Sequence, residues 1–211
     1  MLFRSKTNLI HYSRPRSTGI NAISLREKDE LVSCQLTSGK DEIFLATREG
    51  KAIRFSEKQV RDMGRTASGV RGIRLTKKDE VIAMEIVDTT ATLLGVTELG
   101  FGKKTKFKEY RLQSRGGKGI INVKVLSKNG KVVNALTVEE NDEIIIVTTG
   151  GMVVRCPVNQ VRTSGRNAMG VRLIRLKDNH RVAAVVRVVE KEDGQESTQL
   201  GLLNEEEEKK E

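Results

Sequence analysis

The chain has 211 residues, and 37% of them are hydrophobic, which is enough to bury a core. No apolar run approaches the roughly 18 residues of a membrane-spanning helix. The two histidines and two cysteines lie far apart, without the spacing of a metal site or a disulfide framework. We therefore expect a cytoplasmic protein with free thiols, no bound metal and no contact with a membrane.

Charge is distributed unevenly along the chain. Residues 190–211 contain nine acidic residues and three lysines, a net charge of −6, so residues 1–189 carry +16 and the whole chain +10. A basic body of this size favours a polyanionic partner, with an acidic protein surface as the weaker alternative. Aromatic residues make up only 3%, so there is little material for stacking unpaired bases. Duplex DNA, bound through its phosphates, fits this composition best.

The sequence repeats itself with a period of about 50 residues. Residues 41–83 align without a gap on residues 142–184, with 20 of 43 positions identical. Two further copies are recognised by "GKGIINVKV" in the middle of the chain and "STGINAISL" near its start. The repeats predict a partial first blade at 1–40 and complete blades at 41–90, 91–141 and 142–189, followed by an acidic disordered tail at 190–211.

Within each repeat the pattern is that of β-strands. In the second repeat, "EIFLAT" and "KAIRFS" are short runs of β-forming residues separated by "REG", which predicts a hairpin. A polar connector, the phrase "GRTASGVRGIRL" and a final run, "DEVIAMEIV", complete the repeat. Four short strands per 50 residues predict an all-β, propeller-like array of four-stranded blades with a partial first blade.

The phrase predicts a strand with two different faces. Alternation places Ile73 and Leu75 toward the core, with their counterparts in the third and fourth repeats. Arg74, Lys124 and Arg175 recur on the opposite face, which we expect to be solvated.

Cations recur at several other equivalent positions, and a ring of blades would turn each such position into part of a belt. Isolated charges of this kind often serve only solubility or bond to neighbouring loops, but their repetition favours binding to a curved polyanion. The predicted DNA-binding residues are Arg54, Lys58, Arg61, Arg65, Arg74, Lys103, Lys104, Lys106, Lys108, Arg111, Arg115, Lys118, Lys124, Arg155, Arg162, Arg166 and Arg175.

Several of these stretches, taken in order, resemble one known family. "GVRGIRL", "GFGKKTKFKEY", "GGMVVR" and "GRNAMGVRLIRL" are similar to the C-terminal domain of the DNA gyrase A subunit, from about residue 6 to 189, and the acidic tail is similar too. The resemblance implies a β-pinwheel in which neighbouring blades exchange strands and DNA wraps on the basic perimeter. This chain looks like the last three and a half blades of such a domain.

The resemblance also implies partners and a function. The partners are duplex DNA, the gyrase B subunit, and the rest of the gyrase A subunit, in the nucleoid-associated cytoplasm. The function would be to bend DNA so that the ATP-dependent holoenzyme introduces negative supercoils. No cofactor is expected on this chain, because ATP and Mg²⁺ belong to other parts of the parent enzyme. The alternatives are the comparable domain of the topoisomerase IV A subunit, or a propeller scaffold for an acidic protein.

The stretch "QSRGGKG" is similar to the gyrase box, whose family form is QRRGGKG. Ser114 replaces an arginine, and the stretch lies in a late repeat, whereas the family's box belongs to the first blade. From the residues alone, Arg115 and Lys118 would contact a phosphate beside exposed backbone N–H groups, although a glycine-rich hairpin with incidental charge would have the same pattern. The loop comprises Gln113, Ser114, Arg115, Gly116, Gly117, Lys118 and Gly119.

The sequence offers no candidate catalytic residues. Tyr12 and Tyr110 have no acidic cluster near them in the sequence, and there is no P-loop. We therefore expect a non-catalytic accessory domain of a DNA topoisomerase.

Overall fold

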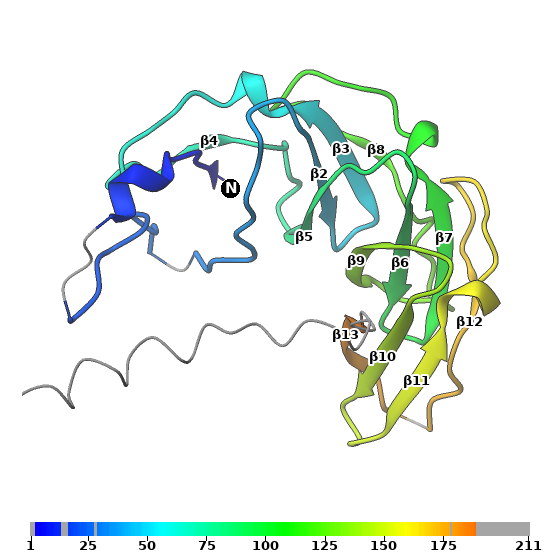
Figure 1. Cartoon of the computed structure of the whole chain (residues 1–211). Helices are drawn as coiled ribbons and strands as arrows, with labels where there is room; N and C mark the ends of the chain where they lie inside the picture. The colour runs from blue at the N-terminus through cyan, green and yellow to red at the C-terminus, as the bar shows by residue number, and fades with distance from the viewer. Residues whose placement is uncertain (1–2, 14–16, 28, 178, 189–211) are drawn as a thin grey trace, which may run out of the picture.

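One succession of elements recurs along the chain, which the computed structural model describes at residues 3–13, 17–27, 29–177 and 179–188 (Figure 1). It consists of a hairpin, a 3-10 turn, a two-residue strand and a longer final strand. In the second repeat these are β2 (Glu42–Thr47), β3 (Lys51–Ser56), η2 (Glu57–Gln59), β4 (Val70–Arg71) and β5 (Val81–Ile86).

The third and fourth repeats follow the same order. The third contains β6 (Thr92–Thr97), β7 (Phe101–Lys106), η3 (Phe107–Glu109), β8 (Ile120–Ile121) and β9 (Val132–Val138). The fourth contains β10 (Glu143–Thr148), β11 (Val153–Pro157), η4 (Val158–Gln160), β12 (Val171–Arg172) and β13 (Val182–Val188). Before them lie β1 (Phe3–Arg4) and η1 (Leu9–Tyr12). The predicted all-β architecture is confirmed.

The two-residue strands leave their own repeat and join the sheet of the preceding one. Strand β8 of the third repeat pairs with β3, which gives the order β5-β2-β3-β8. In the same way β12 pairs with β7 in the sheet β12-β7-β6-β9, and β4 pairs with β1. The fourth repeat forms the sheet β11-β10-β13. Each shared sheet therefore ties two successive repeats together.

The sheets stand side by side along an arc, with β5, β9 and β13 on its inner side and η2, η3 and η4 on its convex outer side (Figure 1). Both faces of a central strand are buried where sheets stack against each other. In β2, for example, Ile43 and Leu45 pack within the second repeat, whereas Phe44 faces the third. This explains why β2 is an unbroken apolar run rather than an alternating one.

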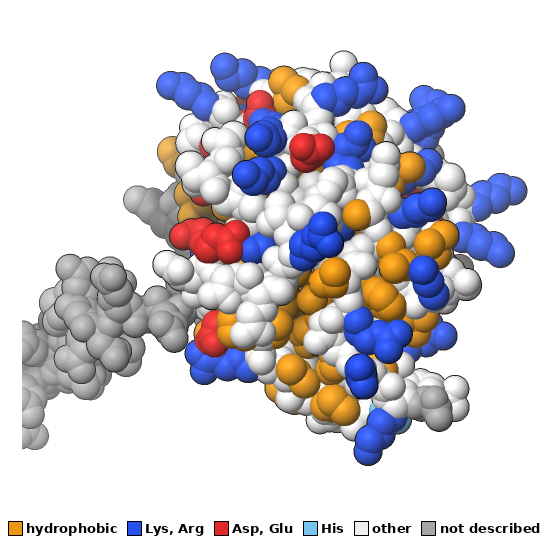
Figure 2. Space-filling model, turned by 90° about the vertical axis from the view of Figure 1, so that its right-hand side faces the viewer, with side chains coloured by type: hydrophobic (Ala, Val, Ile, Leu, Met, Phe, Trp, Pro, Cys, Tyr) orange, Lys and Arg blue, Asp and Glu red, His pale blue; other side chains and the backbone are white. Residues whose placement is uncertain are grey.

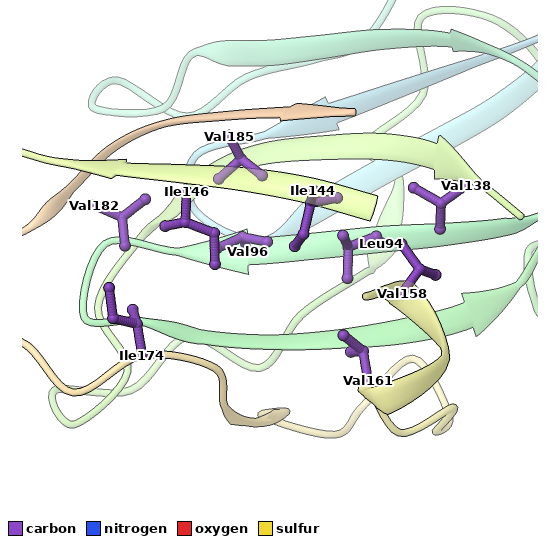
Figure 3. Close-up of a cluster of buried hydrophobic side chains, with 10 residues drawn as sticks. All are labelled: Leu94, Val96, Val138, Ile144, Ile146, Val158, Val161, Ile174, Val182 and Val185. Atoms are coloured by element: carbon purple, nitrogen blue, oxygen red, sulfur yellow. The ribbon is translucent and has the colours of Figure 1, made fainter. Parts of the chain in front are cut away.

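The largest apolar cluster fills the space between the third and fourth repeats (Figure 3). It joins side chains from β6, β9, β10, η4 and β13 with two residues of the connectors. Its buried members are Leu94, Val96, Val138, Ile144, Ile146, Val158, Val161, Ile174, Val182 and Val185.

The strand predicted for each phrase is only two residues long, but the residues that follow β4, β8 and β12 bury the predicted face. Ile73, Val123 and Ile174 are 1%, 2% and 7% exposed, while Arg74, Lys124 and Arg175 are exposed. The acidic tail at 190–211 lies outside the described residues. Among the residues that are described, no helix is long and apolar enough to cross a membrane.

Phe44 provides a test of the packing between repeats. It is fully buried and meets the rings of Phe107 and Tyr110 edge to face, with centroids 5.8 and 4.8 Å away. Phe44→Ala should lower the free energy of unfolding in urea by about 3–5 kcal/mol. Leu112→Ala is the control, because Leu112 is 54% exposed and its loss should change stability by less than ~0.5 kcal/mol. Equal effects would contradict this account of the packing.

Candidate nucleic-acid interface

The convex side of the arc carries a repeated set of exposed cations. The 3-10 turns lie on this side, and Arg61, Arg111 and Arg162 follow them at equivalent positions (Figure 1). The exposed members of the predicted set are Lys58, Arg61, Arg74, Lys106, Lys108, Arg111, Lys118, Lys124, Arg155, Arg162 and Arg175.

One side of the arc is seen face on in Figure 2. Lysine and arginine side chains are spread over its whole height and project at its margins, whereas acidic side chains gather at a few places. Such a surface attracts a polyanion through many weak contacts rather than through one pocket.

A second repeated position holds the repeats together. The guanidinium groups of Arg65, Arg115 and Arg166 each donate a hydrogen bond to a backbone carbonyl of the preceding repeat. The acceptors are Asn21 at 2.9 Å, Arg71 at 2.6 Å and Ile121 at 2.9 Å, in that order. The three acceptors occupy one repeat position as well. These hydrogen bonds join successive repeats, and we call the three residues the staple arginines.

A third repeated position is occupied by ion pairs. Arg54 pairs with Glu42 at 2.5 Å, Lys104 with Glu140 at 2.7 Å, and Arg155 with Glu143. Arg54 also donates to the carbonyls of Phe107 at 2.9 Å and Tyr110 at 3.2 Å in the next repeat.

Two lysines of β7 point into the protein. Lys103 and Lys104 are 1% and 2% exposed, and the Lys103 ammonium donates to the carbonyls of Gly165 at 2.7 Å and Arg166 at 2.6 Å. Burial, with the Arg166 charge nearby, lowers the pKa of Lys103 to about 8. Neither lysine is available to a phosphate, and we leave both out of the proposed interface.

The loop that resembles the gyrase box is hydrogen-bonded to the preceding repeat. The backbone N–H of Arg115 donates to the side chain of Gln59 at 2.7 Å, and that of Gly116 donates to the Gly72 carbonyl at 2.7 Å. The Gly117 carbonyl accepts from the Arg74 N–H at 2.8 Å. The prediction that this loop offers free N–H groups is therefore wrong for Arg115 and Gly116. Lys118 remains exposed.

Sequence reasoning missed a basic hollow between the third and fourth repeats. It has a volume of about 380 Å³, and its lining includes Lys128, Arg172, Lys177 and Arg181. The Arg172 guanidinium lies over the Phe101 ring at 5.2 Å. These cations come from different repeats and do not share one repeat position, so comparing the repeats could not reveal the hollow.

Comparison with known families decides which proteins share this arrangement. The model of the DNA gyrase C-terminal domain, a beta-propeller, matches residues 6–38, 41–88, 91–139 and 142–188. The chain belongs to this family. Each matched segment corresponds to one copy of the 50-residue repeat.

Curated relatives agree with the family. The chain is 58% identical over 185 residues to the DNA gyrase A subunit of Buchnera aphidicola subsp. Acyrthosiphon pisum. The aligned part covers 88% of this chain and 22% of that protein. The chain is 44% identical over 191 residues to the same subunit of Klebsiella oxytoca, covering 90% and 22%. The chain thus spans about a fifth of the length of these relatives.

Two solved structures share the fold. The C-terminal domain of DNA topoisomerase IV has a TM-score of 0.83 and 28% identity, over 88% of this chain and 58% of that one. The DNA gyrase A C-terminal domain has a TM-score of 0.75 and 28% identity, over 82% and 59%. The predicted pinwheel-type array is confirmed by this likeness.

The staple arginines and the exposed cations should respond differently to substitution. Arg115→Ala removes donors to the Arg71 and Gln59 carbonyls, so the free energy of unfolding should fall by about 1–3 kcal/mol. Lys118→Ala in the same loop should leave stability within ~0.5 kcal/mol of the wild type and weaken DNA binding. Urea unfolding and a gel shift of each variant measure the two effects. An unchanged stability of Arg115→Ala would contradict the staple role.

The buried ammonium of Lys103 should make stability depend on pH. The ordinary pKa of a lysine is 10.5, and that of Lys103 in the folded chain is about 8. At pH values between the two, the folded chain has released the Lys103 proton while the unfolded chain still holds it. The contribution of Lys103 to the free energy of unfolding therefore rises with pH across this window and is lost as the pH falls through about 8. Lys103→Met removes this dependence.

The measurement is the difference in unfolding free energy between the wild type and Lys103→Met at several pH values from about 7 to 10. Other groups titrate in the same window, and taking the difference cancels them. A difference that stays constant with pH would show that Lys103 is not desolvated as its burial implies.

Proposed function

We propose that this chain is a non-catalytic module that binds and bends duplex DNA along its convex basic side. The observation that carries the proposal is the recurrence of exposed cations at equivalent positions of successive repeats. Arg61, Arg111 and Arg162 follow the three 3-10 turns, and Arg74, Lys124 and Arg175 recur three residues after the two-residue strands β4, β8 and β12.

The curvature of the arc supports bending rather than binding to straight DNA. Bending a duplex of 20–30 bp costs about 1–6 kcal/mol, which added phosphate contacts along a rigid curved edge can offset. The repeats that carry these cations are joined by shared strands, so the edge holds its shape. Contacts of this kind read the backbone and not the bases, and we expect little sequence preference.

In the parent protein, this module would belong to the gyrase A subunit, where it would act beside the gyrase B subunit. The curated relatives, which are DNA gyrase A subunits, support this assignment. By wrapping DNA, the module would present a second segment to the cleavage gate with a fixed handedness and so direct negative supercoiling. ATP and Mg²⁺ would act elsewhere in that enzyme, which we expect in the nucleoid-associated cytoplasm.

A second candidate is the comparable domain of the topoisomerase IV A subunit. The likeness to the topoisomerase IV C-terminal domain, at a TM-score of 0.83, supports this second candidate. Either candidate would bind DNA on the same surface, and the two would differ in the topology that the whole enzyme produces.

The decisive experiment is a gel-shift series with duplexes of about 20, 60 and 140 bp at two salt concentrations. Affinity should rise with length by more than the added number of binding sites explains, and it should fall steeply with salt. The triple variant Arg61→Ala, Arg111→Ala, Arg162→Ala should bind at least about tenfold more weakly and reduce the salt slope by roughly 3.

A charge-matched variant provides the control. Arg48, Lys77 and Lys78 are exposed too, but they lie outside the basic hollow, at the β2–β3 turn and just before the final strand β5. In the second repeat this segment bonds to the β2–β3 turn, through the Arg48 N–H and the Glu80 carbonyl at 2.9 Å, so it lies at the opposite end of β3 from η2. Replacing these three residues by alanine should weaken binding much less. Equal losses in both triple variants, or binding that ignores duplex length, would favour an acidic protein partner over wrapped DNA.

A further inference from the structure

The basic hollow lies at the junction between the third and fourth repeats, beside the paired strands β7 and β12 (Figure 1). Its volume of about 380 Å³ is within the range of small-molecule sites. Phe101 in its lining is 9% exposed, whereas Lys128 and Arg172 are open to solvent. Lys177 lines it too, but we leave it out of the site because its neighbour Asp178 lies outside the described residues. An apolar base with a cationic margin suits a small anion.

The protein neutralises only part of the positive charge in this hollow. The Arg181 guanidinium, which also lines it, pairs with Glu98 at 2.8 Å. Among the residues that the structure describes, no carboxylate forms an ion pair with Lys128 or Arg172. A hollow lined by charges of one sign raises the local concentration of counter-ions. These two cations are therefore available to an anionic ligand.

The Arg172 guanidinium is positioned by an aromatic ring. Strands β7 and β12 pair Arg172 with Phe101, and the guanidinium carbon lies over the Phe101 ring, 5.2 Å from its centroid. The ring attracts the cation without a hydrogen bond, and within the described chain the guanidinium donates none. Its planar set of N–H donors matches the oxygens of a phosphate group. The arginine is thus held in place while its donors stay free for a ligand.

Backbone hydrogen bonds hold both cation-bearing segments on the β6–β7 turn. The N–H of Leu173, in the connector after β12, donates to the Gly100 carbonyl at 2.8 Å. The N–H of Leu99 donates to the carbonyl of Asn129, in the loop before β9, at 3.2 Å. The two segments therefore keep a fixed separation across the hollow. Groups that are already in place lose little conformational entropy when a ligand binds, which favours affinity.

The shape of the hollow separates its ligand from the duplex proposed for the convex side. Duplex DNA carries its phosphates along the outside of a wide rod, so it cannot bring several of them into one hollow of about 380 Å³. A free chain of phosphates can enter such a space. The adjoining junction also lacks the arginine, because β3 and β8 pair Lys51 with Ile121 at these positions. The hollow therefore suits a small ligand.

We propose that this hollow binds a free polyphosphate group, either inorganic or carried by a nucleotide. The Arg172 guanidinium and the Lys128 ammonium donate hydrogen bonds to oxygens of successive phosphates. Several negative charges in one short chain match several cations in one hollow better than a single carboxylate would. Where a base is attached to the chain, the apolar side chains of Leu99 and Leu176 in the lining are the groups that it contacts.

The experiment is titration calorimetry of the whole chain with inorganic tripolyphosphate in buffer without Mg²⁺. The wild type should bind at a single site per chain. Arg172→Ala and Lys128→Ala should each raise the dissociation constant at least about tenfold, as expected for the loss of a charge-assisted hydrogen bond. Arg61→Ala and Lys78→Ala are the charge-matched controls, because both residues are exposed and neither lines the hollow. Each control should change the dissociation constant less than about twofold.

ATP and a short duplex then identify the source of the phosphates. ATP that binds more tightly than tripolyphosphate, and loses affinity in the same two variants, indicates a nucleotide, whereas weaker binding of ATP indicates an inorganic chain. A 20 bp duplex should bind the double variant Arg172→Ala, Lys128→Ala within about threefold of the wild type.

Three results would overturn the proposal. Equal losses of tripolyphosphate binding in the hollow variants and the controls would show attraction to net charge alone. Absence of saturable binding would show that the hollow is not a site. A double variant that loses the duplex as strongly as tripolyphosphate would make the hollow part of the DNA surface. Circular dichroism establishes that each variant is folded, and Arg172→Lys, which keeps the charge and loses the planar set of donors, should bind with intermediate affinity.

Discussion

The whole structure depends on one constraint, the closure of one edge of β1, β3 and β7 by two residues from the next repeat. A two-residue strand contributes few hydrogen bonds, but it fixes the position of the connector in which it lies. The Gln113 N–H bonds to the Arg54 carbonyl, and the Asn122 and Val123 N–H groups bond to the Gly50 carbonyl. Both ends of the connector are thus anchored on the preceding repeat, and the stacking of the sheets follows from these anchors.

This constraint explains why arginines that all recur in the repeat have different roles in the structure. A position just before the phrase strand lies at the junction with the preceding repeat, so a long cationic side chain there reaches that repeat's backbone. Arg65, Arg115 and Arg166 are such cases, and each bonds to a carbonyl of the earlier repeat. Positions that follow the 3-10 turns lie at the convex rim, so Arg61, Arg111 and Arg162 stay in solvent. The same residue type therefore joins repeats at one position and is open to a ligand at another.

The junctions differ in chemistry although their geometry is the same. Where Ile53 and Phe55 fill the second repeat with apolar atoms, the third has Lys103 and Thr105, which donate to carbonyls of residues 164–166. A buried ammonium is tolerated there because two backbone carbonyls replace its water. The contact of β7 with residues 164–166 is therefore more polar than the equivalent contact of β3, and we expect it to make the stability depend on pH.

The sequence by itself determined the period, the hairpins and the buried positions of each phrase, because these depend on local alternation and on the comparison of repeats. It also identified the family, through several motifs in the right order. Only the tertiary structure decided which cations are free. Burial of Lys103, the carbonyl partner of Arg115 and the loss of free N–H groups at Gly116 all arise from contacts with another repeat. Such contacts join residues some 40 to 60 positions apart, and no local pattern records which atoms of the neighbouring repeat they will meet.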